Sequence, residues 1–299
     1  MKIGTMSIVI GGKKCNAKCP FCISKMTPNC NVKDTELPNW QKNKYYYNLQ
    51  KACRFAEMKG VTTVLLTGKG EPTLYPEEIA NTLQDINKWN FPFIELQTNG
   101  LKIAEWIAND DREGRTRILD WLNLGMTTII LSIVHYEDDR NAEIYRKPYM
   151  NLEKTIDKLH KLGFSVRLSC IMMKTYIDSP FEIKNLIRFA KKNEVEQLTI
   201  RPVSVASDSV VLKTDWGRWA LAHKPDDQNI LLIHKLLKEN GHKLMSLSHG
   251  AEVFDYEGQN ICLSNCLTIE PETDNLRQII VFPDGKIRYD WNYEGAILL

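Results

Sequence analysis

The sequence predicts an α/β fold, a partial (β/α)6 barrel of the TIM-like type followed by a C-terminal extension. Short β-branched, apolar runs alternate with longer amphipathic stretches, which is the pattern of parallel strands joined by crossover helices. Several helical stretches stop before a glycine, at Gly60, Gly125 and Gly163. Because right-handed crossovers place consecutive parallel strands side by side, such units curl into an open barrel with functional loops at the strand C-termini.

The elements are expected in the following order along the chain. Strands are expected at residues 5–10, 61–67, 93–97, 127–134, 165–173 and 197–203. Helices are expected between them at residues 39–59, 76–89, 103–124, 151–162 and 180–193. This order predicts a barrel core over residues 1–203 and an extension over residues 204–299 that covers the barrel.

Composition narrows the class of protein. With 43% hydrophobic and 25% charged residues and a formal net charge of +2, the chain has the make-up of an ordinary globular protein. No stretch has the roughly 20 apolar residues that a membrane helix needs, so we expect no membrane partner. The near-neutral charge argues against a nucleic-acid partner, although a local basic patch stays open. Eight cysteines without a secretory context favour a reducing compartment, the cytoplasm.

Three thiols follow the first apolar run in the spacing Cys15-x3-Cys19-x2-Cys22. Three thiolates on one loop can hold three irons of a [4Fe-4S] cubane and leave the fourth iron open to a small molecule. A structural zinc site closes a tetrahedron with four ligands, and no histidine follows this loop closely. A disulfide framework suits short secreted chains with a leader sequence. The spacing therefore favours an iron-sulfur cluster over zinc or disulfides.

A glycine-rich segment, Gly68-Lys69-Gly70-Glu71-Pro72, follows the second expected strand. Glycines let the backbone approach a ligand closely, and its exposed N–H and C=O groups can then bind a polar group. By itself the segment is explained equally well as a tight strand-to-helix connection. Its expected position beside the three cysteines makes it a candidate ligand loop.

The cysteine motif, with Phe21 before its last thiol, and the Gly-Glu-Pro segment together resemble the radical S-adenosylmethionine (SAM) superfamily over about residues 5–203. The common family form is Gly-Gly-Glu-Pro, so Lys69 departs from it and leaves the Gly-Glu-Pro core intact. The resemblance implies that SAM chelates the open iron and is cleaved reductively to a 5'-deoxyadenosyl radical, which takes hydrogen from a substrate. It also implies an electron donor such as flavodoxin or ferredoxin.

The resemblance implies SAM contacts as well. The glycine segment would help to bind the amino group, Phe21 would lie against the adenine, and polar residues on the last three strands would complete the site. The arginines among them are candidates for the SAM carboxylate, because a charge on a buried strand needs a partner; a core acid would serve equally. Asn99 is also explained by a simple Asn-Gly turn. The candidates are Phe21, Gly68, Gly70, Glu71, Asn99, Ser132, Arg167, Ser169 and Arg201.

The extension carries a second close cysteine pair, Cys262 and Cys266, and a predicted β-hairpin over residues 277–282 and 286–291 with an Asp-Gly turn. Several radical SAM proteins hold an auxiliary cluster in such an extension, and the layout resembles the molybdenum-cofactor cyclase group. An auxiliary iron-sulfur cluster would need further ligands from Cys30, Cys53 or Cys170 or from the substrate, and the last two cysteines have core-like patterns. A structural pair or plain buried thiols are the alternative.

Basic residues are expected at the mouth of the barrel, and they favour a small anionic substrate such as a nucleotide or a phosphorylated metabolite. A solvated charged rim explains them equally well. They are Lys13, Lys14, Lys18, Lys25, Lys69, His135, Arg146, Lys147 and Lys174. Two other functions stay open: modification of RNA or a peptide, and an iron-sulfur or zinc binding module without SAM chemistry.

Overall fold

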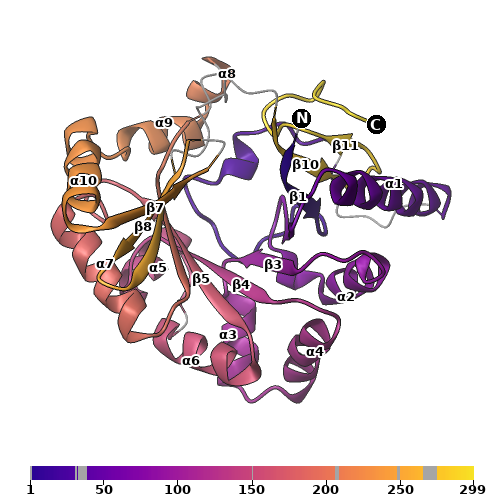
Figure 1. The fold of residues 1–299 in the computed structure, drawn as a ribbon, viewed down its shortest axis with the longest axis horizontal. Helices are drawn as coiled ribbons and strands as arrows, with labels where there is room; N and C mark the ends of the chain where they lie inside the picture. The colour runs from indigo at the N-terminus through magenta and orange to yellow at the C-terminus, as the bar shows by residue number, and fades with distance from the viewer. Residues whose placement is uncertain are drawn as a thin grey trace.

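The structure is a computed structural model that describes residues 2–30, 32, 39–149, 151–205, 209–247, 250–264 and 275–299. In this part of the chain a single 11-stranded sheet has the order β11-β10-β1-β2-β3-β4-β5-β6-β9-β8-β7. Figure 1 shows the helices arranged around the outside of the curved sheet. The two edge strands of the described sheet, β11 and β7, do not pair with each other, so the barrel is open.

The central six strands pair in parallel in chain order. They are β1 (Ile3–Val9), β2 (Thr63–Thr67), β3 (Phe93–Thr98), β4 (Thr128–Ile133), β5 (Ser165–Met172) and β6 (Gln197–Pro202). Each lies within two residues of its predicted bounds. The mixed α/β fold with a parallel, partial-barrel sheet is therefore confirmed.

The helices between these strands are α1 (Asn39–Met58), α2 (Pro76–Ile86), α3 (Leu101–Ala108), α4 (Arg112–Asn123), α5 (Asp138–Tyr145), α6 (Leu152–Leu162) and α7 (Pro180–Lys192). The short 3-10 turns η1 (Ile23–Lys25) and η2 (Pro72–Leu74) follow β1 and β2. The predicted stops are confirmed, since Gly60, Gly125 and Gly163 have φ values of 75°, 97° and 102°.

Two helix predictions need correction. The helix expected over residues 103–124 is two helices, α3 and α4, because Asp111 begins a new one: its Oδ1 accepts hydrogen bonds from the amides of Glu113 (3.0 Å) and Gly114 (3.1 Å). Helix α5 was not predicted, because its short, mainly polar sequence has little apolar periodicity. The ends of α5 are marked by two acidic residues in its first turn and by Arg146, which adopts the left-handed conformation just beyond its last residue.

The two faces of the central strands have different chemistry. Residues such as Met6, Leu66 and Leu168 are fully buried in one large hydrophobic cluster with side chains of the surrounding helices. The alternate positions face the barrel interior, and several of them are polar. The strands look mainly apolar in the sequence because the helix-covered face dominates each of them.

The extension contains α8 (Ser209–Leu212), α9 (Asp215–Ala222), α10 (Asp227–Asn240), β7 (His242–Ser246), β8 (Glu252–Tyr256), β9 (Gln259–Leu263), β10 (Leu276–Val281) and β11 (Ile287–Arg288). Strand β9 pairs in parallel with β6, and β10 pairs in parallel with β1. The extension therefore lengthens the sheet at both edges. The predicted hairpin is confirmed, because β10 and β11 pair antiparallel with Asp284 and Gly285 between them.

None of the described helices is both long and apolar enough to cross a bilayer.

Candidate functional site

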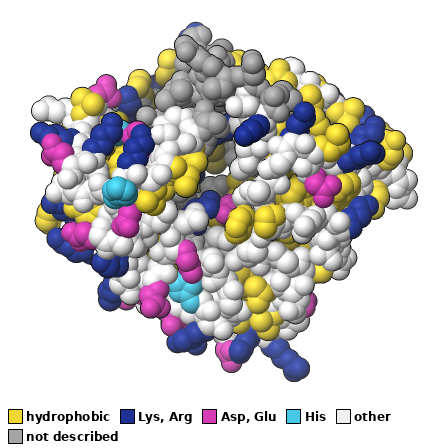
Figure 2. All heavy atoms as spheres, in the orientation of Figure 1, with side chains coloured by type: hydrophobic (Ala, Val, Ile, Leu, Met, Phe, Trp, Pro, Cys, Tyr) yellow, Lys and Arg dark blue, Asp and Glu magenta, His cyan; other side chains and the backbone are white. Residues whose placement is uncertain are grey.

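The cysteine loop leaves the C-terminal end of β1 and borders a cavity of about 390 Å³. Figure 2 shows the molecule hollowed near the middle of one face. The cavity lining brings together most of the predicted site: Cys15, Cys19, Phe21, Cys22, Gly68, Gly70, Glu71, Asn99, Ser132 and Arg201. Loops after β1, β2 and β3 and the ends of β4 and β6 thus meet at one mouth, as expected for the C-terminal side of parallel strands.

The glycine segment packs directly on the cysteine loop. The Glu71 amide donates a hydrogen bond of 2.9 Å to the Lys14 carbonyl. A Cβ atom at Gly70 would lie 2.1 Å from that same carbonyl oxygen, which no real side chain tolerates. Gly68 is also closely enclosed, because a Cβ atom there would lie 3.1 Å from the Ile10 carbonyl oxygen. The two glycines therefore allow the two loops to touch through their backbones.

Glu71 holds the glycine segment in place through its buried carboxylate. Its Oε1 accepts hydrogen bonds from the Thr73 amide (3.0 Å), the Thr73 hydroxyl (2.7 Å) and the Thr98 hydroxyl (2.6 Å). Its Oε2 accepts from the Asn99 amide at 2.9 Å. Burial raises the pKa of Glu71, and these hydrogen bonds oppose that rise. The structure thus gives the Glu71 side chain a structural task, connecting the end of β2 to the end of β3.

Asn99 serves both as a turn residue and as a link to the cysteine loop. Its Oδ1 accepts a 3.0 Å hydrogen bond from the Leu101 amide, and Gly100 has a φ of 77°, which confirms the Asn-Gly turn. Its Nδ2 donates to Asn16 Oδ1 at 2.7 Å and lies 3.8 Å from Cys15 Sγ. One side chain therefore fixes the start of α3 and approaches a predicted cluster ligand.

The three predicted cluster ligands lie on the wall of the same cavity. Cysteines 15, 19 and 22 are free thiols, and each lines the cavity. Among the described residues, no three His, Cys, Asp or Glu side chains converge on a point where one metal ion would bind. A cubane takes one thiolate at each of three separate corners. Cys15 Sγ also accepts a 3.4 Å hydrogen bond from the Ala17 amide, as cluster thiolates commonly do.

The polar residues of the last three core strands divide into two groups. Ser132 and Arg201 line the cavity, and the Arg201 guanidinium donates a 3.0 Å hydrogen bond to the Ser169 hydroxyl. Ser169 thus stands behind Arg201 and does not itself line the cavity. It positions the arginine instead.

Arg167 lies deeper in the barrel, outside the cavity lining. Its guanidinium donates to both carboxylate oxygens of Glu95, at 3.0 and 2.7 Å, and to Gln197 Oε1 at 2.7 Å. The side chain of Glu95 is only 8% exposed. This arrangement matches the alternative given for this half-buried arginine, in which its partner is a core acid.

The extension supplies part of the wall behind the cysteine loop. The Phe21 ring lies 6.2 Å from the Trp219 ring of α9, and Lys25 Nζ lies 5.0 Å from the centre of the Trp216 ring. The loop's Ala17 and Ala220 of α9 belong to the same buried hydrophobic cluster. The partners of these tryptophans were not predicted, because contacts between segments about 200 residues apart leave no local pattern.

Several residues of the cavity lining were not predicted. Tyr145 of α5 is buried, and its hydroxyl donates a 2.6 Å hydrogen bond to the Ser132 carbonyl. Others come from the interior face of the strands, from the segment after the cysteine loop and from the extension. They include Ser7, Thr27, Gln97, Gln278 and Trp291. The usable signal was the period of two along each strand, since Gln97 and Gln278 lie on interior positions.

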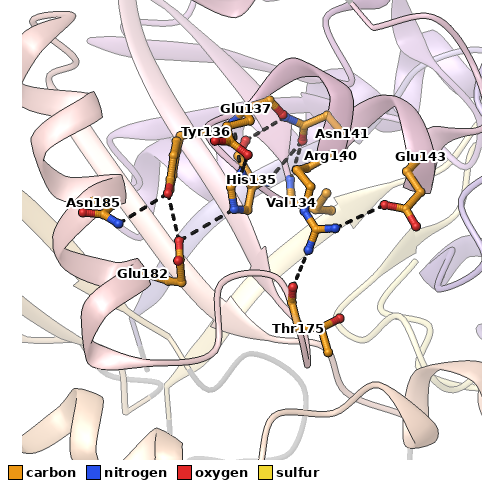
Figure 3. A network of polar contacts seen from close by, with 10 residues as sticks. All are labelled: Val134, His135, Tyr136, Glu137, Arg140, Asn141, Glu143, Thr175, Glu182 and Asn185. Atoms are coloured by element: carbon orange, nitrogen blue, oxygen red, sulfur yellow. Dashed lines mark hydrogen bonds and ion pairs between the residues drawn. The ribbon is translucent and has the colours of Figure 1, made fainter.

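His135, one of the basic residues expected at the mouth, belongs to a separate network (Figure 3). It is 5% exposed, its Nδ1 accepts a 3.1 Å hydrogen bond from the Glu137 amide, and its Nε2 lies 3.7 Å from Glu182 Oε2. The Tyr136 hydroxyl donates to the same Glu182 oxygen at 3.0 Å. Burial lowers the pKa of His135, and the nearby carboxylates oppose that effect. This network joins the loop after β4 to α7.

Of the predicted basic rim, Lys69 lines the cavity. Its side chain is 6% exposed, and its Nζ donates a 2.6 Å hydrogen bond to the Thr27 hydroxyl. On the face drawn in Figure 2, Lys and Arg side chains are spread around the edge with Asp and Glu among them. This mixture of basic and acidic side chains fits the alternative interpretation of the exposed basic residues, which is a solvated charged rim.

Among the described residues, the other cysteines do not line the cavity. Cys53 and Cys170 are fully buried core thiols, as their sequence patterns indicated, and Cys30 is also buried. Cys262 lies on β9, and Cys266 lies outside the described residues. The auxiliary cluster therefore stays a prediction.

Comparison with solved structures shows the fold of known SAM enzymes. SuiB from Streptococcus suis bound to S-adenosylmethionine matches with a TM-score of 0.57 at 17% identity, covering 95% of this chain and 60% of that chain. Coproporphyrinogen III oxidase (HemN) from Escherichia coli matches with a TM-score of 0.51 at 14% identity, covering 85% of this chain and 56% of that chain. The chain thus spans about 60% of the length of SuiB. No curated protein sequence matches it significantly.

A family model described as the radical SAM superfamily matches residues 9–190, which is more than half of the 299 residues. The matched segment contains the cysteine motif, the glycine segment and the ends of β3 to β5 that border the cavity. Membership implies a [4Fe-4S] cluster and SAM as cofactors, and the thiol set on the cavity wall fits them. The chain belongs to the radical SAM superfamily.

Proposed function

We propose that this enzyme cleaves SAM reductively and uses the 5'-deoxyadenosyl radical to take a hydrogen atom from a small anionic molecule bound in the same cavity. The supporting observation is that Cys15, Cys19 and Cys22 share one cavity with the glycine segment and with Ser132 and Arg201. When bound, the cluster supplies the electron for cleavage of the sulfonium.

Each cavity residue has a proposed role. The three thiolates hold the cluster, and the backbone of Gly68 and Gly70 approaches the SAM amino group. Arg201, held by Ser169, is oriented toward the SAM carboxylate, and Ser132 and Asn99 provide further polar contacts. Phe21 borders the adenine from the side of α9. Glu71 acts indirectly, by holding the glycine segment, because both of its carboxylate oxygens already accept hydrogen bonds from backbone and hydroxyl donors.

The charge of the cavity supports a small anionic substrate. Its lining includes the basic residues Lys69 and Arg201, whereas Glu71 is engaged internally. If the substrate is an RNA or a peptide, a screen for deuterium transfer into 5'-deoxyadenosine would show it.

Three further elements of the proposal follow from the chemistry. A low-potential donor such as flavodoxin or ferredoxin delivers the electron. A reducing compartment, the cytoplasm, suits the free thiols of the described chain. Residues 1–203 form the core and residues 204–299 an extension that shapes the cavity through Trp291.

The decisive experiment is anaerobic reconstitution followed by iron and sulfide counting and by measurement of 5'-deoxyadenosine after addition of dithionite. We expect about four irons per chain and 5'-deoxyadenosine from the wild type, and neither from the Cys22→Ala variant. The Cys53→Ala variant is the matched control, because that thiol lies in the core. A colourless protein that holds one zinc and produces no 5'-deoxyadenosine would refute the proposal. Deuterated nucleotides, peptides and RNA are then screened for transfer of deuterium into 5'-deoxyadenosine.

A further inference from the structure

Lys69 is a buried cation at the position where this chain departs from Gly-Gly-Glu-Pro. Its side chain is 6% exposed and lines the cavity. The Nζ donates to the Thr27 hydroxyl at 2.6 Å and lies 5.6 Å from the centre of the Trp291 ring. The Thr27 hydroxyl in turn donates to the Ile23 carbonyl at 3.0 Å. An ammonium has three N–H donors, so Thr27 uses only one of them.

Two other cations of this fold, the buried Arg288 and the half-buried Arg167, have a carboxylate partner. Arg288, with a side chain 2% exposed, pairs with Asp284 at 3.1 Å, and Arg167 pairs with Glu95 at 2.7 Å. For Lys69, no carboxylate among the described residues lies within ion-pair distance, and the acidic groups that act on it are the thiols of Cys30 and Cys22, of which Cys22 is a proposed cluster ligand. Burying an ammonium without a counter-charge is costly unless an anion accompanies it. A cavity wall is where such an anion can arrive from solution.

The position of Lys69 separates it from two of the proposed SAM contacts, Ser132 and Arg201, whereas Gly68 and Gly70 on either side of it are the residues proposed for the SAM amino group. Thr27 follows the cysteine loop after β1, Lys69 follows β2, and Trp291 follows β11. In the sheet, β11, β10, β1 and β2 are neighbours, whereas Ser132 and Arg201 come from β4 and β6, on the far side of β3. The cavity lining therefore has Arg201 on one side and Lys69, together with Arg277 of β10, on the other.

We propose that Lys69, Thr27 and Trp291 form an oxyanion subsite that binds the carboxylate or phosphate group of the substrate. The Lys69 ammonium donates to the oxyanion, Thr27 fixes the position of the ammonium, and the Trp291 ring borders the apolar part of the substrate next to the anion. This inference rests on the proposed function, and it names the substrate by its charge and by the side of the cavity on which it binds.

The test uses the reconstituted enzyme with SAM and without reductant. Calorimetry measures the binding of benzoate and phenyl phosphate, with benzamide as the uncharged probe. We expect at least one of the two anions to bind and benzamide to bind at least tenfold more weakly; which anion binds tells a carboxylate from a phosphate substrate. In Lys69→Met the affinity for that anion falls at least tenfold while the SAM affinity stays within twofold. Lys102→Met, at an exposed lysine paired with Glu105, is the matched control and leaves both affinities unchanged.

Several results would overturn the subsite: binding of neither anion to the wild type, equal binding of benzamide, or unchanged anion binding in Lys69→Met. A tenfold loss of SAM affinity in that variant would assign Lys69 to SAM instead. A wild-type measurement guards against misfolding of the variant: the bound anion should slow acylation of Lys69 by an amine-reactive reagent, followed by mass spectrometry, and no protection would contradict the proposal. Formation of 5'-deoxyadenosine with dithionite is measured on the same samples. If it occurs while the binding tests fail, the subsite alone is rejected.

Discussion

Replacing Glu71 by glutamine tests whether its carboxylate holds the glycine segment in place. Glutamine keeps the volume and one acceptor oxygen, but its NH2 group then faces the Asn99 amide, a donor against a donor. One buried hydrogen bond is lost and one N–H is left without a partner, which costs about 2 kcal/mol. The loss of charge assistance in the other three bonds is partly offset, because a buried carboxylate no longer needs to be ionised.

The assay is thermal unfolding of the metal-free, reduced protein, which removes any contribution from cofactor binding. For a chain of this size about 2 kcal/mol lowers the unfolding midpoint by about 4 °C. Glu71→Ala leaves all four donors unpaired and creates a cavity, so we expect a loss of about 4 kcal/mol or more. Thr98→Val removes a single hydroxyl donor and serves as the control. A Glu71→Gln midpoint within about 1 °C of wild type, or a Glu71→Ala variant no less stable than Thr98→Val, would refute the reasoning.

The remaining predictions concern three contacts. Gly70→Ala forces a Cβ into the Lys14 carbonyl 2.1 Å away, so we expect the cysteine loop to shift and the iron bound after reconstitution to fall by more than half. Asp284→Asn leaves the Arg288 charge buried and partly unpaired, so the free energy of unfolding should fall by about 3 kcal/mol in denaturant titrations. Trp219→Ala opens the wall behind the cysteine loop, so the cluster absorbance should decay several-fold faster in air.

Each of these has a control and a contrary result. Gly295→Ala, where an added Cβ meets nothing within 4 Å, should bind iron like the wild type, and equal loss in both alanine variants would contradict the Gly70 argument. Asp215→Asn breaks an exposed ion pair and should cost at most about 1 kcal/mol; an equal cost at Asp284 would show that burial does not matter there. Leu221→Ala changes an exposed residue of the same helix α9 and is the control. If the cluster absorbance of Leu221→Ala decays in air as fast as that of Trp219→Ala, Trp219 does not shield the cluster.

The core of the fold could be predicted because its signals are local. Each parallel strand is a short β-branched run, and each helix that ends at a left-handed glycine carries its own stop. The cysteine motif is local as well, so its three thiols were found from spacing alone. The break between α3 and α4 was not predicted, because the apolar periodicity runs through it. Asp111 caps α4 by accepting two amide hydrogen bonds, and it lies inside that periodic stretch.

The site was harder to predict because its polar contacts join distant segments. Arg167 and Glu95 lie 72 positions apart and meet only because β3 and β5 flank β4. Both arginines of the last strands were treated alike, yet one ends in a core ion pair and the other at the cavity. What separates them is depth along the barrel: Arg167 is the third residue of β5, whereas Arg201 is near the C-terminal end of β6. The alternation of side chains along a strand predicts the face of the sheet on which a residue lies. The distance of that residue from the C-terminal end of the strand predicts how deep in the barrel it lies.

The extension shows why the chain cannot be divided simply into a catalytic core and an accessory part. Strand β10 pairs with β1 and β9 pairs with β6, so both edges of the six-stranded core depend on residues beyond 203 for their backbone hydrogen bonds. The same extension supplies Trp291 to the cavity and Trp219 to the wall behind Phe21. In members of this superfamily the chemistry belongs to the cofactors, and the protein determines which molecule meets the radical. In this chain the cavity proposed for that selection is lined by residues of the C-terminal segment as well as by residues of the barrel.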